Sequence, residues 1–508
     1  MSRDVHQLTK AVDVQGGEKI MSSRSKHPEL TWHQQMDHQD DAGIIFQHED
    51  RVFLLDIPWS ITMAQGRLPA SQHSSSKDLP FIKRRRLLSC SPLKEPYPST
   101  EPKKPAARAN VFGTIPESER RYHSERIMPL VEEALETIRT AISPTQWGLD
   151  RVVPVEKVAS SGSQDGVSRK RRNQDPPSIN CDHIFNNEPP LILSSSSPNE
   201  FKSSCELNVV KNPSPESAII NIAYNGDMGP SSYRVPPESS FTLCTLPLFE
   251  TANDRSSLLY PIPGLSSDQK FNLILMDPPW PNRSVRRSAH YKTHHYSEME
   301  VLAEGLRDIL QTHSCDPEFT PQAPCTGPPP DSHARQSLAA IWITNAEKSR
   351  KAAYQALVGS GFRICEEWIW IKTTIDGRPI SALDGIWRKP YETLVIGRRD
   401  VDVRTSKEQG SLPRMDDLAS ISDGVSIRRV IAAVPDLHSR KPNLKGMFER
   451  IFFKSDCAQS YSALEVFARN LTAGWWAAGN EVLKFNACDC WVDPSESGYE
   501  LKEQLLRT

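Results

Sequence analysis

The chain has 508 residues, 37% of them hydrophobic and 24% charged, with 41 prolines but only 24 glycines. This length exceeds one ordinary domain, and the proline excess predicts folded parts interrupted by unstructured stretches. Sixty-one basic and 63 acidic residues give a net charge of −2, so any surface for a polyanion must be local. The sequence has no apolar run of ~18 residues and no signal-peptide core, which excludes a membrane partner. Ten scattered cysteines are typical of a reducing compartment.

The N-terminal part is expected to be only partly ordered. Residues 1–42 are polar without a sustained period and are predicted to be a disordered tail. Residues 43–216 are expected to form an accessory region with disordered Ser/Pro-rich linkers. Within it, residues 43–63 alternate like two short strands or a docking segment, and apolar residues at helical spacing predict a helix near 127–142.

Two basic runs lie in this N-terminal part, Lys83–Arg86 and Arg169–Arg172. Such runs are typical of nuclear localisation signals or of flexible RNA tethers. We therefore expect the protein in the nucleus, with the cytoplasm as a second location.

From residue 217 to 490 the strand and helix signals alternate, which predicts an α/β sheet with helices on both faces. The expected strands are 217–224, 241–246, 271–276, 341–344, 362–372, 393–398, 427–434 and 464–468, with helices at 346–358 and 444–453. A Pro-rich insertion is expected at 312–336 and a C-terminal tail at 491–508. The spacing of His and Cys in that insertion fits no familiar zinc motif, so we expect no metal site.

The strand at 271–276 runs directly into Asp277-Pro278-Pro279-Trp280. Ligands bind at the carboxyl ends of strands in open α/β sheets. The two prolines remove backbone donors, so the carboxylate and the carbonyl groups form a site that accepts hydrogen bonds. A planar exocyclic amine on an aromatic base suits such a site, and Trp280 would stack on the base or form a pocket wall. A rigid turn without catalytic function is the alternative.

Several separated segments occur in an order that resembles a known family: 271–280, SVRRSAHY (284–291), WITN (342–345), WIWIK (368–372), RKPYE (388–392), LHSRKP (437–442) and 464–485. Together they resemble the DPPW-type adenine N6-methyltransferases, the family of the seventy-kilodalton messenger-RNA adenosine methyltransferase subunit, and within it the methyltransferase-like-four branch. The resemblance implies a Rossmann-like fold that uses S-adenosylmethionine. It also implies a permuted order, in which the catalytic motif precedes much of the cofactor-binding part.

The resemblance also implies residue roles. Asp277 and the Pro278 carbonyl would accept from the adenine amine, with Pro279 and Trp280 completing the catalytic motif. Residues near the cofactor would be Asp277, Lys441, Glu465, Arg469, Asn480 and Glu481. An acidic cofactor contact common in the family is missing from strand 241–246, so Thr245 substitutes for it or the contact is absent. Residues near the substrate would be Arg286, Arg287, His290, Tyr291, Asn345, Lys389, Tyr391 and Glu392.

The branch implies a specific reaction, which is methylation of N6 on internal 2′-O-methyladenosine of spliceosomal U2 small nuclear RNA. Adenine in DNA is the alternative substrate, for which the base would be flipped out of the duplex. A non-catalytic nucleic-acid-binding subunit is a third hypothesis, which the intact Asp277 motif disfavours. Protein-glutamine methylation is disfavoured because that activity typically has Asn in place of Asp277. The sequence leaves the oligomeric state open.

Overall fold

The computed structural model describes ten ranges of the chain: 43–66, 85–154, 189–224, 230–248, 260–281, 299–316, 337–399, 424–438, 440–453 and 461–493. The predicted tail at 1–42 and the insertion from residue 317 onward lie outside these ranges. All described residues belong to one unit, 40–508.

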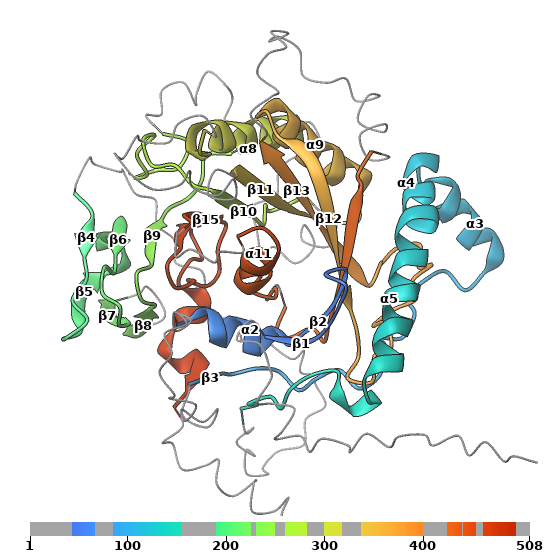
Figure 1. Cartoon of the computed structure of the whole chain (residues 1–508), viewed down its shortest axis with the longest axis horizontal. Helices are drawn as coiled ribbons and strands as arrows, with labels where there is room; N and C mark the ends of the chain where they lie inside the picture. The colour runs from blue at the N-terminus through green and yellow to red at the C-terminus, as the bar shows by residue number, and fades with distance from the viewer. Residues whose placement is uncertain are drawn as a thin grey trace, which may run out of the picture. The chain divides into compact units, whose positions relative to one another are not determined.

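A twelve-stranded sheet forms the centre of this unit (Figure 1). Its strand order is β1-β2-β14-β12-β13-β11-β10-β15-β16-β9-β6-β4. The bounds are β1 Ile44–His48, β2 Val52–Leu55, β4 Leu191–Ile192, β6 Val209–Lys211, β9 Ser240–Leu243, β10 Leu273–Met276, β11 Ser337–Ile343, β12 Arg363–Lys372, β13 Tyr391–Arg399, β14 Ile427–Ala433, β15 Ala463–Val466 and β16 Trp476–Gly479. The expected strands from residue 241 onward are therefore present, and the α/β fold class predicted from the sequence is confirmed.

The direction of the strands decides where the functional residues meet. β10 lies in the middle of the sheet and pairs in parallel with β11 on one side and β15 on the other. Because parallel strands end at the same edge, Asp277 after β10 and the residues after β15 lie together. The chain reaches β10 before β15, so the Asp277 segment precedes the residues after β15, as the resemblance implied.

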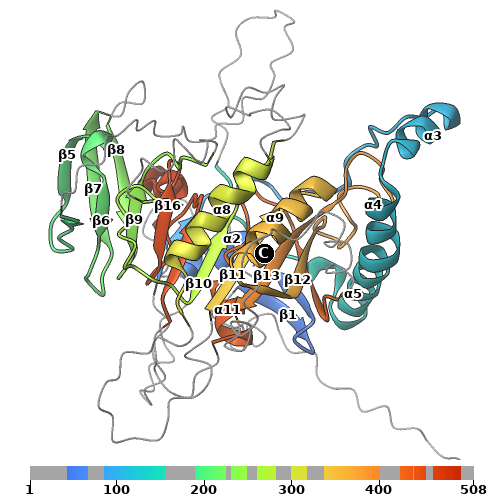
Figure 2. The same cartoon turned by 90° about the horizontal axis from the view of Figure 1, so that it is seen from above.

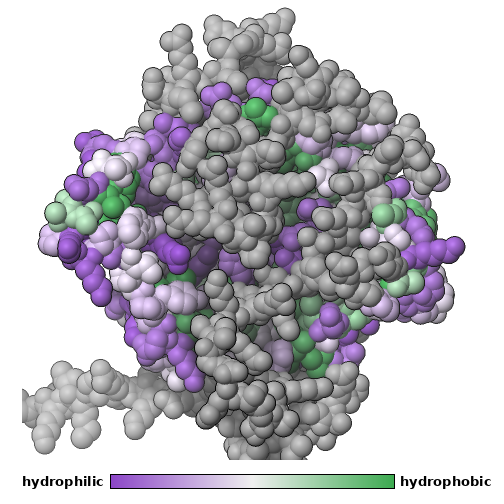
Figure 3. Space-filling model, turned by 180° about the vertical axis from the view of Figure 1, so that it is seen from behind, coloured by the Kyte–Doolittle hydropathy of each residue, from purple (hydrophilic) through white to green (hydrophobic). Residues whose placement is uncertain are grey.

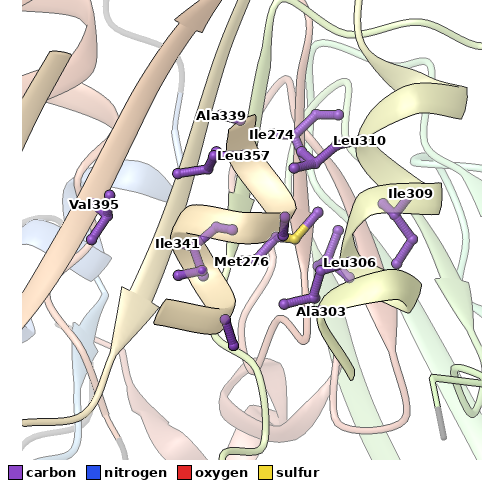
Figure 4. Close-up of a cluster of buried hydrophobic side chains, with 14 of the residues drawn as sticks. Ile274, Met276, Ala303, Leu306, Ile309, Leu310, Ala339, Ile341, Leu357 and Val395 are labelled. Atoms are coloured by element: carbon purple, nitrogen blue, oxygen red, sulfur yellow. The ribbon is translucent and has the colours of Figure 1, made fainter. Parts of the chain in front are cut away.

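Helices cover both faces of the sheet (Figures 1 and 2). α8 Met299–His313 and α9 Glu347–Gly359 cover one face, where their apolar side chains pack on β10 and β11. Figure 4 shows Ile274 and Met276 of β10 beside Leu306 and Leu310 of α8. The other face is covered by α2 Ile57–Ala64 and α11 Lys445–Ile451, which pack in one core cluster with Trp368 and Trp370 of β12. Side chains alternate between the faces along each strand, so one strand contributes to both layers.

The N-terminal residues belong to the main sheet. β1 and β2 form an antiparallel pair, and β2 pairs in parallel with β14. The sheet thus crosses the boundary that was expected at residue 217. Residues 57–64 form helix α2, which differs from the strands or docking segment expected for 43–63. The Asp56 carboxylate accepts from the Trp59 amide at 2.8 Å, and Pro58 occupies the first turn, so this sequence starts a helix.

α5 Met128–Ala141 occupies the position predicted for the amphipathic helix. It begins near Pro129, after a π-helical turn, η2 Tyr122–Ile127. Its buried residues Val131, Ala134, Leu135 and Ile138 pack on β2, β12 and β14. The helix therefore covers the sheet on the face that α8 and α9 cover further along.

The described residues also form two small sheets. One consists of β5 Asn199–Ser203, β7 Ala218–Tyr224 and β8 Ser231–Val235, and the other pairs β3 Arg86–Leu87 with β17 Trp491–Val492. β4, β5 and β6 lie in a stretch expected to be a linker, where short strands rich in polar residues give a weak pattern. Among the described residues no helix has the length and apolar character needed to cross a bilayer. Among the coloured residues in Figure 3, hydrophilic ones are the most common, with small apolar patches between them.

Candidate active site

The Asp277-Pro-Pro-Trp280 segment leaves the sheet at the carboxyl end of β10. The Asp277 amide still donates to the Val466 carbonyl of β15 at 3.3 Å, which anchors the start of the segment. The Trp280 amide donates to the Pro278 carbonyl at 2.8 Å, and the Trp280 indole donates to the Trp342 carbonyl at 2.7 Å. Trp280 is only 6% exposed and packs in the core under the sheet edge. Trp280 is therefore a structural anchor of the motif in this structure, and its ring faces the core.

Two cations hold the Asp277 carboxylate. Lys441 Nζ lies 3.2 Å from Oδ1, and Arg469 Nη1 donates to Oδ2 at 3.2 Å. The side chain of Asp277 keeps 22% of its surface exposed, so further donors have access to it. A carboxylate has about four acceptor positions, and these two contacts leave some of them open.

The two cations are themselves held by carboxylates on the far side from Asp277. Lys441 donates to Glu392 at 2.7 Å, and Lys372 donates to the other oxygen of Glu392. Arg469 Nε donates to Glu481 at 2.8 Å, and Lys484 donates to the same carboxyl group at 3.0 Å. A chain of alternating charges thus runs from Lys372 through Asp277 to Lys484, and it fixes the orientation of the Asp277 carboxylate.

These contacts shift the pKa values of the partners. Burial would lower the pKa of Lys441, but the Asp277 and Glu392 carboxylates outweigh it and raise that pKa. Burial would likewise raise the pKa of Glu392, but Lys441 and Lys372 hold it well below its usual value. Both groups therefore stay charged at neutral pH.

Glu465 of β15 behaves in the opposite way. Burial and, to a smaller extent, the Asp277 charge raise its pKa to about 8, while Arg469 acts against the shift. Glu465 sits opposite Leu275 in the register of β10 and β15, one strand away from Asp277. The Glu465 carboxyl group is therefore mostly protonated at neutral pH and can donate a hydrogen bond in the site.

These groups line a cleft of about 520 Å³, a volume that includes its open mouth. Its walls combine polar groups with aromatic rings: Leu275, Asp277, Trp342, Lys441, Pro442, Asn443, Leu444, Glu465, Phe467, Arg469, Asn470, Trp475 and Phe485. Phe467 has a φ of 63°, a left-handed conformation that is costly for a bulky residue. This backbone turn comes directly after β15 and is held by the Phe467 amide, which donates to the Ala478 carbonyl at 2.7 Å.

The structure brings together Asp277, Lys441, Glu465 and Arg469 of the predicted cofactor residues, with Glu481 behind Arg469. Thr245 and Asn480 are exposed, and neither is among the described residues that line the cleft. Of the predicted substrate residues, Glu392 contacts Lys441 as part of the charge chain. Arg286, Arg287, His290 and Tyr291 lie outside the described residues.

Three other predicted substrate residues form a separate cluster at the start of β13. The Tyr391 hydroxyl is hydrogen-bonded to His123 Nδ1 of η2 at 2.6 Å, and Tyr391 is buried. The Asn345 side chain donates to the Tyr391 carbonyl, and Lys389 is half-buried nearby in sequence. In this structure Tyr391 therefore connects the N-terminal helices to the sheet.

Sequence reasoning missed several residues of the site. Lys372 and Lys484 support the charge chain from its ends. Both lie within the segments that carry the resemblance, WIWIK and 464–485, as do Trp342 in WITN and Phe467 in 464–485. Trp475, in the same segment, packs in the core and also lines the cleft.

Arg440, where the family segment has a histidine, is buried beside Lys441. Its guanidinium donates to the Leu88 carbonyl at 2.9 Å, contacts Asp436 at 2.5 Å and lies over the Phe485 ring at 4.3 Å. This residue therefore holds the segment that carries Lys441 against the cleft wall.

Comparison with known proteins finds sequences similar to the part of the chain that carries this site. Residues 328–481 match the MT-A70 family, a range that contains Glu392, Lys441, Glu465 and Arg469 but begins after Asp277. The N6-methyladenosine RNA methyltransferase MTA1 of Cryphonectria parasitica is 38% identical over 230 residues, which cover 44% of this chain and 55% of that protein.

Two further relatives differ in their named substrates. The N(6)-adenine-specific methyltransferase METTL4 of Homo sapiens is 30% identical over 288 residues, 56% of this chain and 49% of that protein. A DNA N6-methyl methyltransferase of Caenorhabditis elegans is 24% identical over 253 residues, 49% of this chain and 53% of that protein. The chain spans about half the length of the curated relatives it matches. Residues 328–481 are thus similar to the MT-A70 family, and the chain is similar to proteins named as MTA1 and METTL4 N6-adenine methyltransferases.

Proposed function

We propose that this chain is an S-adenosylmethionine-dependent methyltransferase that methylates the N6 amine of adenine in RNA. The observation that carries the proposal is the Asp277 carboxylate, which Lys441 and Arg469 hold at the carboxyl end of β10 in an open cleft. The relatives named as N6-adenine methyltransferases support the same reaction. By resemblance, the finer substrate is internal 2′-O-methyladenosine of spliceosomal U2 small nuclear RNA.

The chemistry of the cleft fits the methyl donor. MT-A70 methyltransferases use S-adenosylmethionine, which supplies an electrophilic methyl group on a sulfonium centre. Lys441 and Arg469 match the charge of its carboxylate, Glu465 can hydrogen-bond its hydroxyl groups, and Phe467 and Trp475 offer faces for its purine ring.

The residues of the chain then position the amine and receive its proton. One N6 hydrogen is accepted by Asp277 and the other by the second lone pair of the Pro278 carbonyl. With both hydrogens held, the nitrogen lone pair turns toward the donor methyl group. The bond from N6 to the methyl carbon forms as the sulfonium bond to that carbon breaks. The extra proton on N6 leaves to Asp277 or to water. Alignment of the two reactants supplies much of the acceleration.

The test is incubation of the full chain with methyl-labelled donor and total RNA, digestion to nucleosides, and comparison with Asp277→Asn. Asn keeps the size of the side chain but loses the charge and one acceptor. We expect labelled N6-methylated adenosine with the original chain and a fall of at least 100-fold with Asp277→Asn, equivalent to ~3 kcal/mol of barrier. Absence of label with the original chain would contradict the proposed activity. Equal label in both would instead contradict the role of Asp277.

DNA is the second candidate substrate, and the C. elegans relative, which is named for DNA, favours it. Single-stranded and duplex DNA in the same assay separate the two, because duplex DNA requires extrusion of the base. To test the finer RNA proposal, U2 small nuclear RNA with and without the 2′-O-methyl group is compared. Label that ignores the 2′-O-methyl group would contradict that finer substrate.

We also infer a nuclear location from the two basic runs. Arg85 of the first run is paired with Asp493 at 2.7 Å, and Arg86 lies in β3, so the second run, Arg169–Arg172, is the stronger candidate signal. A fluorescent fusion with this run changed to alanine should shift to the cytoplasm. A nuclear signal unchanged by that substitution would contradict the assignment.

A further inference from the structure

The loop 373–390, which joins β12 to β13, exposes an indole ring. Trp387 is 54% exposed, which is unusual for the largest apolar side chain. Arg388 and Lys389 follow it directly, and Arg388 is exposed. We call residues 373–390 the Trp387 loop. An exposed ring beside cations is the arrangement with which proteins stack unpaired bases and contact the neighbouring phosphates.

The Trp387 loop leaves the sheet at the edge that carries Asp277. β12 runs antiparallel to β13, β13 runs antiparallel to β11, and β11 runs parallel to β10, so the carboxyl end of β12 is on that edge. The Lys372 amide at the start of the loop donates to the Pro390 carbonyl at its end, at 2.7 Å. Glu392, two residues further on, shares Lys441 with Asp277. Trp387 is three residues from Pro390, so the two backbones lie within about 11 Å of each other.

The N-terminal part of the chain holds this loop in place. The Ile375 amide donates to the Leu93 carbonyl at 2.9 Å, and the Tyr97 amide donates to the Ile380 carbonyl at 2.8 Å. Nearer to Trp387, the Ile386 amide donates to the Glu101 carboxylate, which is itself paired with Arg108 at 2.5 Å.

The turn around Gly385 is also tight. A side chain there would approach the Arg388 carbonyl oxygen to 2.6 Å, so the turn accepts only glycine without rearrangement. Tyr97, which is 57% exposed, lies in the N-terminal segment that hydrogen-bonds to this loop and presents a second exposed aromatic side chain. A ring presented by a fixed backbone loses little entropy on binding, so the Trp387 loop is organised before its ligand arrives.

We propose that Trp387 stacks on an unpaired base that flanks the target adenine, while Arg388 contacts the adjacent phosphate. This inference rests on the proposed function in one respect, that the substrate is a nucleic acid. It adds that the substrate is single-stranded on the side of the loop, because the face of an unpaired base is open to stacking whereas a base inside a duplex is covered by its neighbours.

The test measures binding of a fluorescein-labelled single-stranded RNA oligonucleotide to the full chain by anisotropy, without donor. Trp387→Ala should weaken binding by about 5- to 150-fold, the range that corresponds to ~1–3 kcal/mol per stacked base. Trp387→Phe keeps a stacking face and should retain most of the affinity. Arg388→Ala should weaken binding and lower the slope of log affinity against log salt by about one.

The matched control is Ile192→Ala. Ile192 is 60% exposed, and it lies on β4, the last strand in the sheet order, five positions from β10 and eight from β12. This variant should bind like the original chain. Equal affinity of Trp387→Ala and the original chain would overturn the inference, as would an equal loss in Trp387→Phe. If RNA binding depends on Trp387 but the original chain transfers no methyl group, the proposed function is overturned while this inference stands.

Discussion

Two neighbouring carboxyl groups in the cleft have different surroundings. Asp277 is held between Lys441 and Arg469, whereas burial raises the pKa of Glu465 to about 8. The sequence predicted Asp277 because it follows an apolar strand, and the family resemblance implied Glu465. Neither could predict the surroundings of Asp277, because Lys441 and Arg469 lie more than 150 residues away from it in the chain. Tyr391 shows the same limit, since its partner His123 comes from the N-terminal helices.

The pKa of Glu465 predicts a pH dependence of stability. Its folded-state pKa of about 8 exceeds the ordinary value of 4.5, so the folded chain binds this proton more tightly than the unfolded chain. The stabilisation is complete below about pH 4.5 and is lost as the pH rises to about 8. Glu465→Gln should therefore show a smaller fall in the free energy of unfolding between pH 5 and 8, measured by urea denaturation. The exposed Glu132→Gln should follow the original chain, and identical pH profiles for Glu465→Gln and the original chain would contradict the assigned pKa.

At the scale of elements, periodicity predicted the helices and strands whose own residues form a clear apolar pattern. α5 was predicted because its apolar stripe repeats at helical spacing, and β10 because its four residues are all apolar. α2 was predicted as part of a strand region because Ile57 and Ile61 extend the apolar run of β2. The Asp56 cap decides for a helix, and that signal is a single hydrogen bond.

α5 carries the second prediction. Ile138 is fully buried against β2, β12 and β14, so Ile138→Ala should lower the free energy of unfolding by about 2–5 kcal/mol, because it leaves a cavity. Glu132→Ala on the exposed side of the same helix should change it by no more than about 0.5 kcal/mol. Chemical denaturation of both variants measures the difference. An Ile138→Ala effect as small as that of the control would show that α5 contributes little to the stability of the sheet.

At the scale of the whole molecule, the sequence predicted strands and their chain order but not their neighbours. β2 pairs with β14, almost 380 residues later, and β15 inserts between β10 and β16. Such contacts depend on side chains from distant segments that fit together, which no local pattern contains. The boundary expected at residue 217 followed a change in composition. The sheet instead extends through residues on both sides of that boundary.

This topology predicts that residues 43–66 are required for folding. Phe53, Leu54, Leu55, Ile57 and Ile61 are each no more than 1% exposed. At about 1.5–3 kcal/mol per buried side chain, their loss approaches the whole stability of a domain, about 5–15 kcal/mol. A chain that begins at residue 67 should therefore lose its cooperative thermal transition in circular dichroism and bind neither donor nor RNA. A chain that begins at residue 43 keeps every described residue and should melt like the full chain. The contrary outcome is a cooperative transition at the original temperature in the chain that begins at residue 67. It would show that β14 is stable as an edge strand and that the sheet folds without β1, β2 and α2.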